Sequence, residues 1–310
     1  MYFPYFRGKR YELLAIAEMS PLLLGTSSRV IPTIEPVRSA AQEMSLLRKL
    51  IGLGFPLTLI ENPSHGDFKA EPEKIQNLLK ESRDRRHLVA GYLVGSKTTL
   101  KEVQGFLRRN KDRQVAFYHF GSAVKPDRLS ELQSKADVAY NVFLSGKSSV
   151  AYRGAFSTGQ PIILEDPFGI RDRNEDYPPH EFYSDRHKTF SSDRYGGFGD
   201  FLIVGNQFKE SGGAALAVAI HYTNLEGDNE IWIRHFLSDR TTGRGVDPAG
   251  KFLEALEKLA RFIQSGENWR LTEGGREFLD LYNRQHYPGL GSAKKTAMKH
   301  HLELMNALFL

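Results

Sequence analysis

The sequence of 310 residues contains no cysteine. Disulfide bonds, thiolate nucleophiles and cysteine-ligated zinc or iron–sulfur clusters are therefore excluded. Because nothing in the chain requires an oxidising compartment, we expect a cytoplasmic location. Long hydrophobic runs are also missing, and residues 1–9 hold no apolar signal segment. The sequence therefore predicts neither a membrane span nor a secretory signal.

The excess of one charge sign is small. Lys and Arg number 42, whereas Asp and Glu number 37, which gives a net charge of +5. The hydrophobic content of 40% and charged content of 25% are typical of a globular chain with a substantial core. A slightly basic chain is compatible with an anionic partner such as nucleic acid. It is also typical of a soluble protein with a few spare lysines.

Three short apolar runs end in an acidic residue that a proline soon follows. The runs are 30–34, 57–60 and 162–164, and the acids after them are Glu35, Glu61, Glu165 and Asp166. Such runs are typical of strands that are buried on both faces of a parallel sheet. Proline cannot continue the hydrogen-bonded ladder, so each strand is expected to end at its acid. In α/β folds, ligands bind at this carboxyl edge of the strands.

Strand-like and helix-like segments alternate over the first 170 residues. The expected strand ends are Phe6, Glu35, Glu61, Val94, Phe120, Leu144 and Asp166. Every interval between them is long enough for a helix to return the chain, which indicates a parallel sheet. Seven such strands favour a TIM-barrel-like (β/α)8 parallel barrel, and a doubly wound open sheet is the alternative.

The repeat lapses after residue 166. The segment 167–199 is rich in arginine and has little periodicity, and we predict a long loop or lid over the strand ends. A strand is expected at 201–205, and the turn at 224–229 predicts an antiparallel hairpin. We therefore predict an α/β barrel-like domain over 1–265 and a C-terminal helical extension over 266–310.

The residues near the strand ends are of types that carry out chemistry. Glu35, Glu61, Glu165 and Asp166 are suited to holding Mg²⁺ or Mn²⁺, while His119 and His221 are candidates for a general base. His235 also lies near the end of a predicted strand. Arg7 and Lys9 would hold a phosphate group. The alternative is that each acid caps a helix or pairs with an arginine. No motif demands an organic cofactor.

A glycine-rich turn precedes the last predicted helix. Gly289 and Gly291 leave backbone N–H groups open to approach, and Lys294 and Lys295 follow at the start of the helix. This combination suits an anion. The alternative is a tight turn in which the glycines adopt positive φ and let two packed helices meet.

Several short motifs resemble the beta family proteins of bacteria and phages, which are named after a beta protein of a T-even phage. The motifs are YFPYFRGK at 2–9, ELLA at 12–15, IPTIEP at 31–36, DPAGK at 247–251, and PGLG at 288–291 with His300 and His301. The resemblance implies a bacterial or phage-related context and suggests a role in phage defence. It implies no reaction and no catalytic residues.

Two functions follow from these observations. The first is a non-catalytic protein that binds nucleic acid or a protein partner through the 167–199 segment and the C-terminal helices. The second is a metal-dependent phosphodiesterase or phosphoryl-transfer enzyme with its site at the carboxyl edge of the barrel. The chain has no complete P-loop, G-x-S-x-G or H-E-x-x-H motif, which favours the binding function.

Overall fold

A computed structural model describes residues 1–82, 85–122, 124–210, 216–239, 243 and 245–309. The chain forms two compact units. The barrel unit comprises Met1–Leu13, Ser20–Asp166 and Lys188–Asp200; the sheet unit comprises Leu14–Met19, Pro167–His187 and Phe201–Leu310. The predicted boundary at residue 265 lies inside the sheet unit. Residues 201–264 therefore group with the C-terminal helices and not with the barrel.

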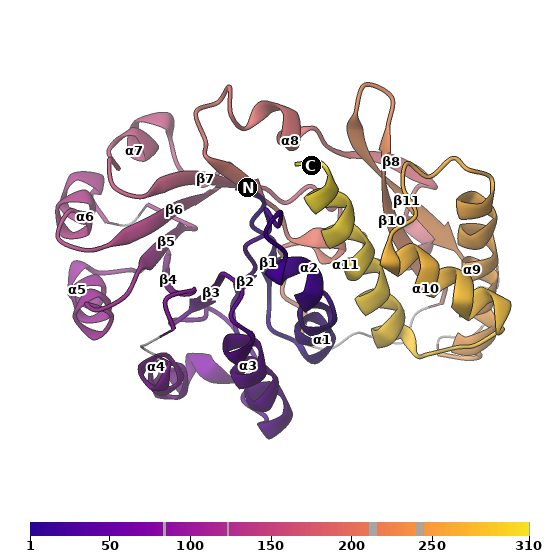
Figure 1. Cartoon of the computed structure of the whole chain (residues 1–310), viewed down its shortest axis with the longest axis horizontal. Coiled ribbons are helices and arrows are strands. Elements are labelled where there is room, and N and C mark those ends of the chain that lie inside the picture. Colours follow the sequence, from indigo (N-terminus) through magenta and orange to yellow (C-terminus); the bar gives the residue numbers. More distant parts are fainter. Residues whose placement is uncertain (83–84, 123, 211–215, 240–242, 244, 310) are drawn as a thin grey trace. The chain divides into compact units, whose positions relative to one another are not determined.

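The barrel unit is a nearly closed parallel barrel, which confirms the predicted TIM-like (β/α)8 fold (Figure 1). Its strands follow the chain in order: β1 (Tyr5–Phe6), β2 (Thr33–Ile34), β3 (Leu57–Ile60), β4 (Leu88–Val94), β5 (Val115–His119), β6 (Val138–Leu144), β7 (Gln160–Leu164) and β9 (Gly197–Gly199). The first seven strands end within two residues of their predicted ends. The strand ends could be predicted because short apolar runs and the residues that terminate them are local features of the sequence.

Helices alternate with the strands, and α3 to α7 lie outside β2 to β7 (Figure 1). The helices are α1 (Arg10–Glu18, divided between the two units), α2 (Ser20–Leu24), α3 (Ala41–Leu53), α4 (Pro72–Glu81), α5 (Leu100–Arg109), α6 (Pro126–Gln133) and α7 (Val150–Gly154). Local sequence sets their ends. For example, Thr99 and Glu102 form a reciprocal capping box at the start of α5, which buries Val103 and Phe106.

The barrel closes between β9 and the N-terminal strand. Tyr2 forms a parallel bridge with Phe198, and the Phe3 N–H donates to the Phe198 carbonyl oxygen at 2.8 Å. The Tyr5 N–H donates to the Asp200 carbonyl oxygen at 2.9 Å. The eighth strand thus lies in the segment that we predicted to be a loop. It has only three residues, Gly-Phe-Gly, which is too short for a periodic signal.

Replacing Gly199 with alanine is expected to lower the free energy of unfolding by about 2 kcal/mol, because the added Cβ would overlap the Phe3 carbonyl at the barrel seam. Urea unfolding of the full chain measures the change. The matched control is Gly52→Ala in α3. There the described residues place no neighbouring atom within 4 Å of an added Cβ. The control should be neutral or slightly stabilising, since alanine favours the helix. Equal stabilities of the two variants would contradict this account of the seam.

The sheet unit contains a three-stranded antiparallel sheet in the order β10-β11-β8. Its elements are β8 (His180–Ser184), α8 (Arg186–Thr189, divided between the units), β10 (Ala219–Glu226), β11 (Glu230–Leu237), α9 (Pro248–Gln264), α10 (Glu273–Asn283) and α11 (Leu290–Ala307). Residues 227–229, the second half of the predicted turn at 224–229, connect β10 to β11, and the antiparallel pairing confirms the predicted hairpin. Phe262 of α9 packs against Tyr222 and Phe236, so helix and sheet share a core.

Two predictions for this part of the chain are wrong. The segment 167–199 is not one irregular loop, because it contains β8 of the sheet unit and β9 of the barrel. Its placement over the strand ends stays a prediction. The expected strand at 201–205 is a 3-10 turn over Leu202–Val204. Its apolar composition resembles a strand, but Leu202 has a φ of +51°, which a strand does not allow. No helix in the described ranges combines the length and the apolar composition needed to cross a bilayer.

Candidate functional sites

The acids that we predicted at the strand ends lie at one edge of the barrel. Glu35, Glu61 and Glu165 directly follow β2, β3 and β7, and all three strands are parallel. Their side chains do not converge, however. Successive residues of a strand point to opposite faces, so one acid can face the interior while another faces the surrounding helices.

Glu35 faces the barrel interior, where it organises a buried polar cluster. Its carboxylate forms an ion pair with Arg7, accepts from the Tyr5 hydroxyl at 2.8 Å, and accepts from the Ser64 N–H and Oγ at 2.7 Å each. Nδ1 of His65 lies 2.7 Å from Ser64 Oγ. Burial acts to raise the pKa of Glu35, but His65, Arg7 and Ser64 outweigh it and lower the pKa to about 2. Glu35 is therefore an ion that holds Arg7 and Ser64 in place.

Glu61 faces the helices instead. Arg109 Nε and Nη2 donate to its Oε1 at 2.9 and 2.5 Å, and Asn110 Nδ2 donates to its Oε2 at 2.6 Å. This buried carboxylate ties β3 to the end of α5. Glu165 is half-buried and Asp166 is exposed. The alternative reading of an acid paired with an arginine therefore describes both Glu35 and Glu61.

His119 is fully buried between β5 and the helices. Its ring nitrogens hydrogen bond to Tyr152 Oη at 3.0 Å and Asn141 Oδ1 at 2.8 Å, and its ring stacks on Phe143. Burial lowers the pKa of His119 to about 4, although the Asn141 hydrogen bond acts in the opposite direction. This histidine is neutral at physiological pH and lies within the core. Its surroundings do not suit the predicted general base.

The predicted Mg²⁺ or Mn²⁺ site lacks a fitting donor set. Within the described ranges, no three His, Asp or Glu side chains come together in a group that could hold a metal ion. Glu35 and Glu61 each bind an arginine on opposite sides of the barrel wall. Hard cations need several oxygen ligands around one point.

The predicted anion site before α11 is largely occupied by the protein itself. Gly289 has a φ of +88°, as the tight-turn alternative requires. Nζ of Lys295 lies 2.6 Å from Glu18 Oε1, and this lysine side chain is only 14% exposed. Gly291 lies in the first turn of α11, and Lys294 directly follows that turn and is exposed. Of the two interpretations, the tight turn describes the segment before α11 better.

Lys9, which we predicted to hold a phosphate group, is half-buried. Its backbone N–H points to Glu12 Oε2 at 3.4 Å.

One face of the three-stranded sheet carries a chain of three ionisable side chains, which we call the histidine relay (Glu181, His235, His221). Each of the three strands supplies one member. Oε1 of Glu181 lies 3.1 Å from His235 Nε2, and His235 Nδ1 lies 2.6 Å from His221 Nδ1. The strand register places them together, because His221 lies directly opposite His235 and Glu181 lies opposite Ile233.

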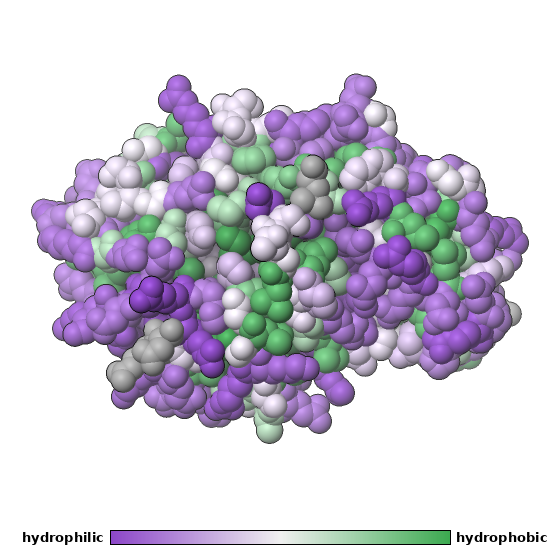
Figure 2. Space-filling view, viewed as in Figure 1, coloured by the Kyte–Doolittle hydropathy of each residue, from purple (hydrophilic) through white to green (hydrophobic). Residues whose placement is uncertain are grey.

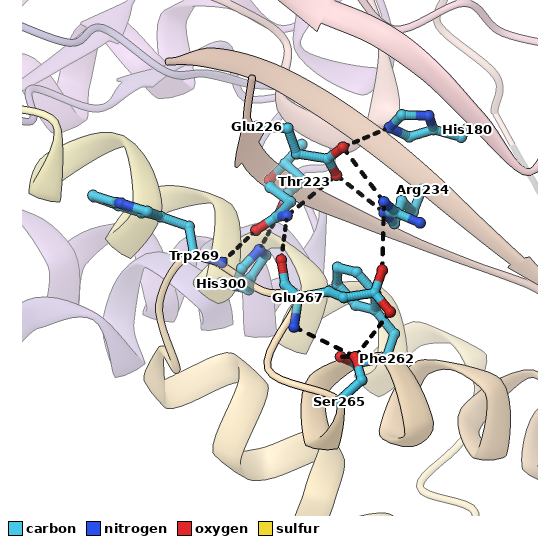
Figure 3. Close-up of polar contacts among 10 residues, drawn as sticks. His180, Thr223, Glu226, Arg234, Phe262, Ser265, Glu267, Trp269 and His300 are labelled. Atoms are coloured by element: carbon cyan, nitrogen blue, oxygen red, sulfur yellow. Dashed lines mark hydrogen bonds and ion pairs between the residues drawn. The ribbon is translucent and has the colours of Figure 1, made fainter. Parts of the chain in front are cut away.

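The opposite face carries what we call the aromatic patch (His180, Phe182, Trp232). The His180 ring stacks on Trp232 with centroids 4.6 Å apart, and Phe182 meets the same indole edge-on at 5.7 Å. Phe182 is 47% exposed. His180 Nε2 and Arg234 Nε both lie 3.0 Å from the Glu226 carboxylate (Figure 3). Hydrophilic side chains predominate on the face shown in Figure 2, with hydrophobic areas among them, one over the sheet unit.

Sequence reasoning found His221 but not the geometry around it. The alternation in His180-Glu181-Phe182 is a readable signal that the acid and the two rings lie on opposite faces of a strand. The partner strand and its register are not readable, because β8 and β11 are about 50 residues apart in the chain. Comparisons with protein-family models, curated sequences and solved structures found no significant match.

Proposed function

We propose that the chain is a binding protein and that its sheet unit recognises a protein partner through the aromatic patch. The observation that carries the proposal is a mutually packed set of three rings on β8 and β11, of which His180 and Phe182 are exposed and Trp232 is half-buried. Aromatic side chains that pack together at the surface, rather than singly, are typical of sites that bind a partner. Under the family resemblance, a phage protein is the first partner to test.

The packing within the patch favours tight binding. The Trp232 indole packs against the rings of both His180 and Phe182, and the Glu226 carboxylate in turn holds His180 in place. Rings that are already ordered lose little conformational entropy when a partner covers them. Tryptophan in particular is enriched among the residues that dominate interface energies.

The charges beside the patch favour a protein over nucleic acid. Two cationic groups lie close to it, His180 when protonated and Arg234, and both bind the Glu226 carboxylate. Glu267 lies 4.0 Å from Arg234 and its side chain is 60% exposed. Nucleic-acid surfaces need cations that neutralise phosphates, whereas this surface has carboxylates next to its rings.

Selection from a random peptide library on the immobilised full chain tests the proposal. We expect peptides with an apolar anchor residue whose affinity falls at least about tenfold for Phe182→Ala and Trp232→Ala, as for other buried aromatic contacts. The matched control is Trp269→Ala, which removes the other tryptophan of the chain, 43% exposed and outside the patch. Its loss should leave peptide affinity unchanged.

Two outcomes would count against the proposal. One is a selection that yields no peptide sensitive to Phe182 or Trp232. The other is patch-dependent binding of single-stranded oligonucleotides, measured by fluorescence anisotropy, with an affinity that falls steeply as salt rises. The second result would assign the patch to base stacking.

A further inference from the structure

The proposed binding at the aromatic patch makes no use of the histidine relay, whose rings pack against Phe168 and Tyr177. The histidine relay lies on the face opposite the patch, because Glu181 alternates with His180 and Phe182 along β8. We propose that His221 is a general base in a second functional site, and that His235 and Glu181 are positioning residues that set its tautomer. The site would hydrolyse an ester of a carboxylic or phosphoric acid.

Hydrogen-bonding rules determine where the protons lie in the relay. A carboxylate only accepts, so His235 Nε2 carries the hydrogen that faces Glu181 Oε1 at 3.1 Å. A neutral imidazole has one N–H, which leaves a lone pair on His235 Nδ1. His221 Nδ1 must then donate to it across 2.6 Å. The second lone pair of the relay therefore lies on His221 Nε2, where a base would need it.

His221 Nε2 is open to a substrate. The described residues place no hydrogen-bond partner on this atom, and it is not among the buried polar atoms that lack one. The residue is half-buried, with the rings of Phe168 and Tyr177 against its imidazole at centroid distances of 5.0 and 4.7 Å. Such a base would be partly shielded from water and still reachable.

The surrounding charges keep the relay in its basic form. Burial, the neighbouring His235 and the positive charge of Lys294 on α11 hold the pKa of His221 well below its usual range. Burial also lowers the pKa of His235, and Arg171 and His180 act in the same direction, while Glu181 opposes them. His221 is therefore unprotonated at neutral pH, as a general base must be.

The proposed step balances in protons and charge. His221 Nε2 takes a proton from water, and the water oxygen bonds to the carbonyl carbon or phosphorus of the ester. The Nδ1 hydrogen of His221 can pass to His235, so that the positive charge lies beside the Glu181 carboxylate. The bond to the leaving alkoxide then breaks. The alkoxide takes the Nε2 proton of His221 while the shared hydrogen returns from His235 to His221 Nδ1, which restores both neutral rings. No oxidant, reductant or second reactant other than water is needed.

Chromogenic esters test the site in the full chain. We expect saturable hydrolysis of p-nitrophenyl acetate or bis(p-nitrophenyl) phosphate, faster than by free imidazole at the same concentration. His221→Ala should lower the rate at least about 100-fold, as for other general bases. His221→Asn keeps an N–H for His235 and should be equally inactive but folded. His286→Ala removes an exposed histidine and should change nothing.

The pH profile separates a positioning role from a merely structural one. Glu181 raises the pKa of its neighbour His235, so Glu181→Gln should lower the plateau rate and move the acid limb to lower pH. A structural role would lower the rate without moving the limb.

The outcomes decide between the alternatives. Hydrolysis of only the carboxylic or only the phosphoric ester, lost in both His221 variants, would support the site and identify its substrate class. The proposal would be overturned if the wild-type protein were no faster than imidazole. It would also be overturned if either His221 variant kept the rate. Neither result would bear on peptide binding at the aromatic patch.

Discussion

Replacing Glu35 with alanine is expected to destabilise the barrel unit by about 3–5 kcal/mol, the usual cost of removing one partner of a buried ion pair. The change would leave the Arg7 guanidinium, whose side chain is 7% exposed, without its carboxylate. The Tyr5 hydroxyl and the Ser64 N–H and Oγ would lose their acceptor at the same time. Urea unfolding, or hydrogen exchange resolved to barrel peptides, measures the loss.

Two further variants make the Glu35 result specific. Glu35→Gln keeps the shape and most acceptors but removes the charge, so its cost should be smaller than that of alanine. Glu131→Ala is the surface control, because Glu131 forms ion pairs with Arg128 and Lys135 on a solvent-exposed face of α6. Exposed pairs contribute little, and no measurable change is expected. If the Glu35 and Glu131 variants were equally stable, the cluster at the barrel edge would not be a structural anchor.

Acidification is expected to destabilise the sheet unit through His300. This histidine is fully buried, stacks on Tyr222 at 3.6 Å, donates from Nε2 to the Thr223 carbonyl oxygen at 2.6 Å, and accepts from the Thr272 hydroxyl at 2.7 Å. Burial lowers its pKa to about 3, with the nearby His301 adding to the effect and the Thr223 hydrogen bond opposing it. The folded state therefore holds His300 neutral.

The sign of the effect follows from this lowered pKa. Above a pH of about 6.5, the pKa of a histidine in the unfolded chain, the His300 ring is neutral in both states. It then has no effect on the free energy of unfolding. As the pH falls below that value, the unfolded chain gains a proton that the folded chain resists, until the folded pKa near 3 is reached. Each pH unit in this window costs about 1.4 kcal/mol, or about 2 kcal/mol between pH 6.5 and pH 5.

The contribution of His300 can be measured by comparing the wild type with His300→Gln. The free energy of unfolding of each protein is measured from about pH 7 to about pH 5. Most carboxylates are still ionised in that range, so they contribute little to the difference. Glutamine can still donate to Thr223 but does not titrate, and the variant should lose stability more slowly on acidification. Identical slopes for the two proteins would rule out His300 as the source.

The amino-acid sequence by itself determined the parallel barrel. Apolar runs of three to five residues, the prolines after Glu35, Glu61 and Asp166, and helix-length intervals are all local features. Each feature depends only on the few residues around it, so each can be recognised in the sequence before the fold is known. The seventh strand and its six predecessors were located this way. The eighth strand was missed because its three residues pair only once the barrel brings them to Tyr2.

Only the tertiary structure decided what the polar residues do. Glu35 and Glu61 look alike in sequence, but one faces Tyr5 inside the barrel and the other faces Arg109 on α5. The histidine relay likewise depends on the register of three strands, and a shift of one residue in β8 would turn Glu181 away from His235. These contacts join residues far apart in the chain. Their energies depend on burial and orientation, which no local pattern encodes.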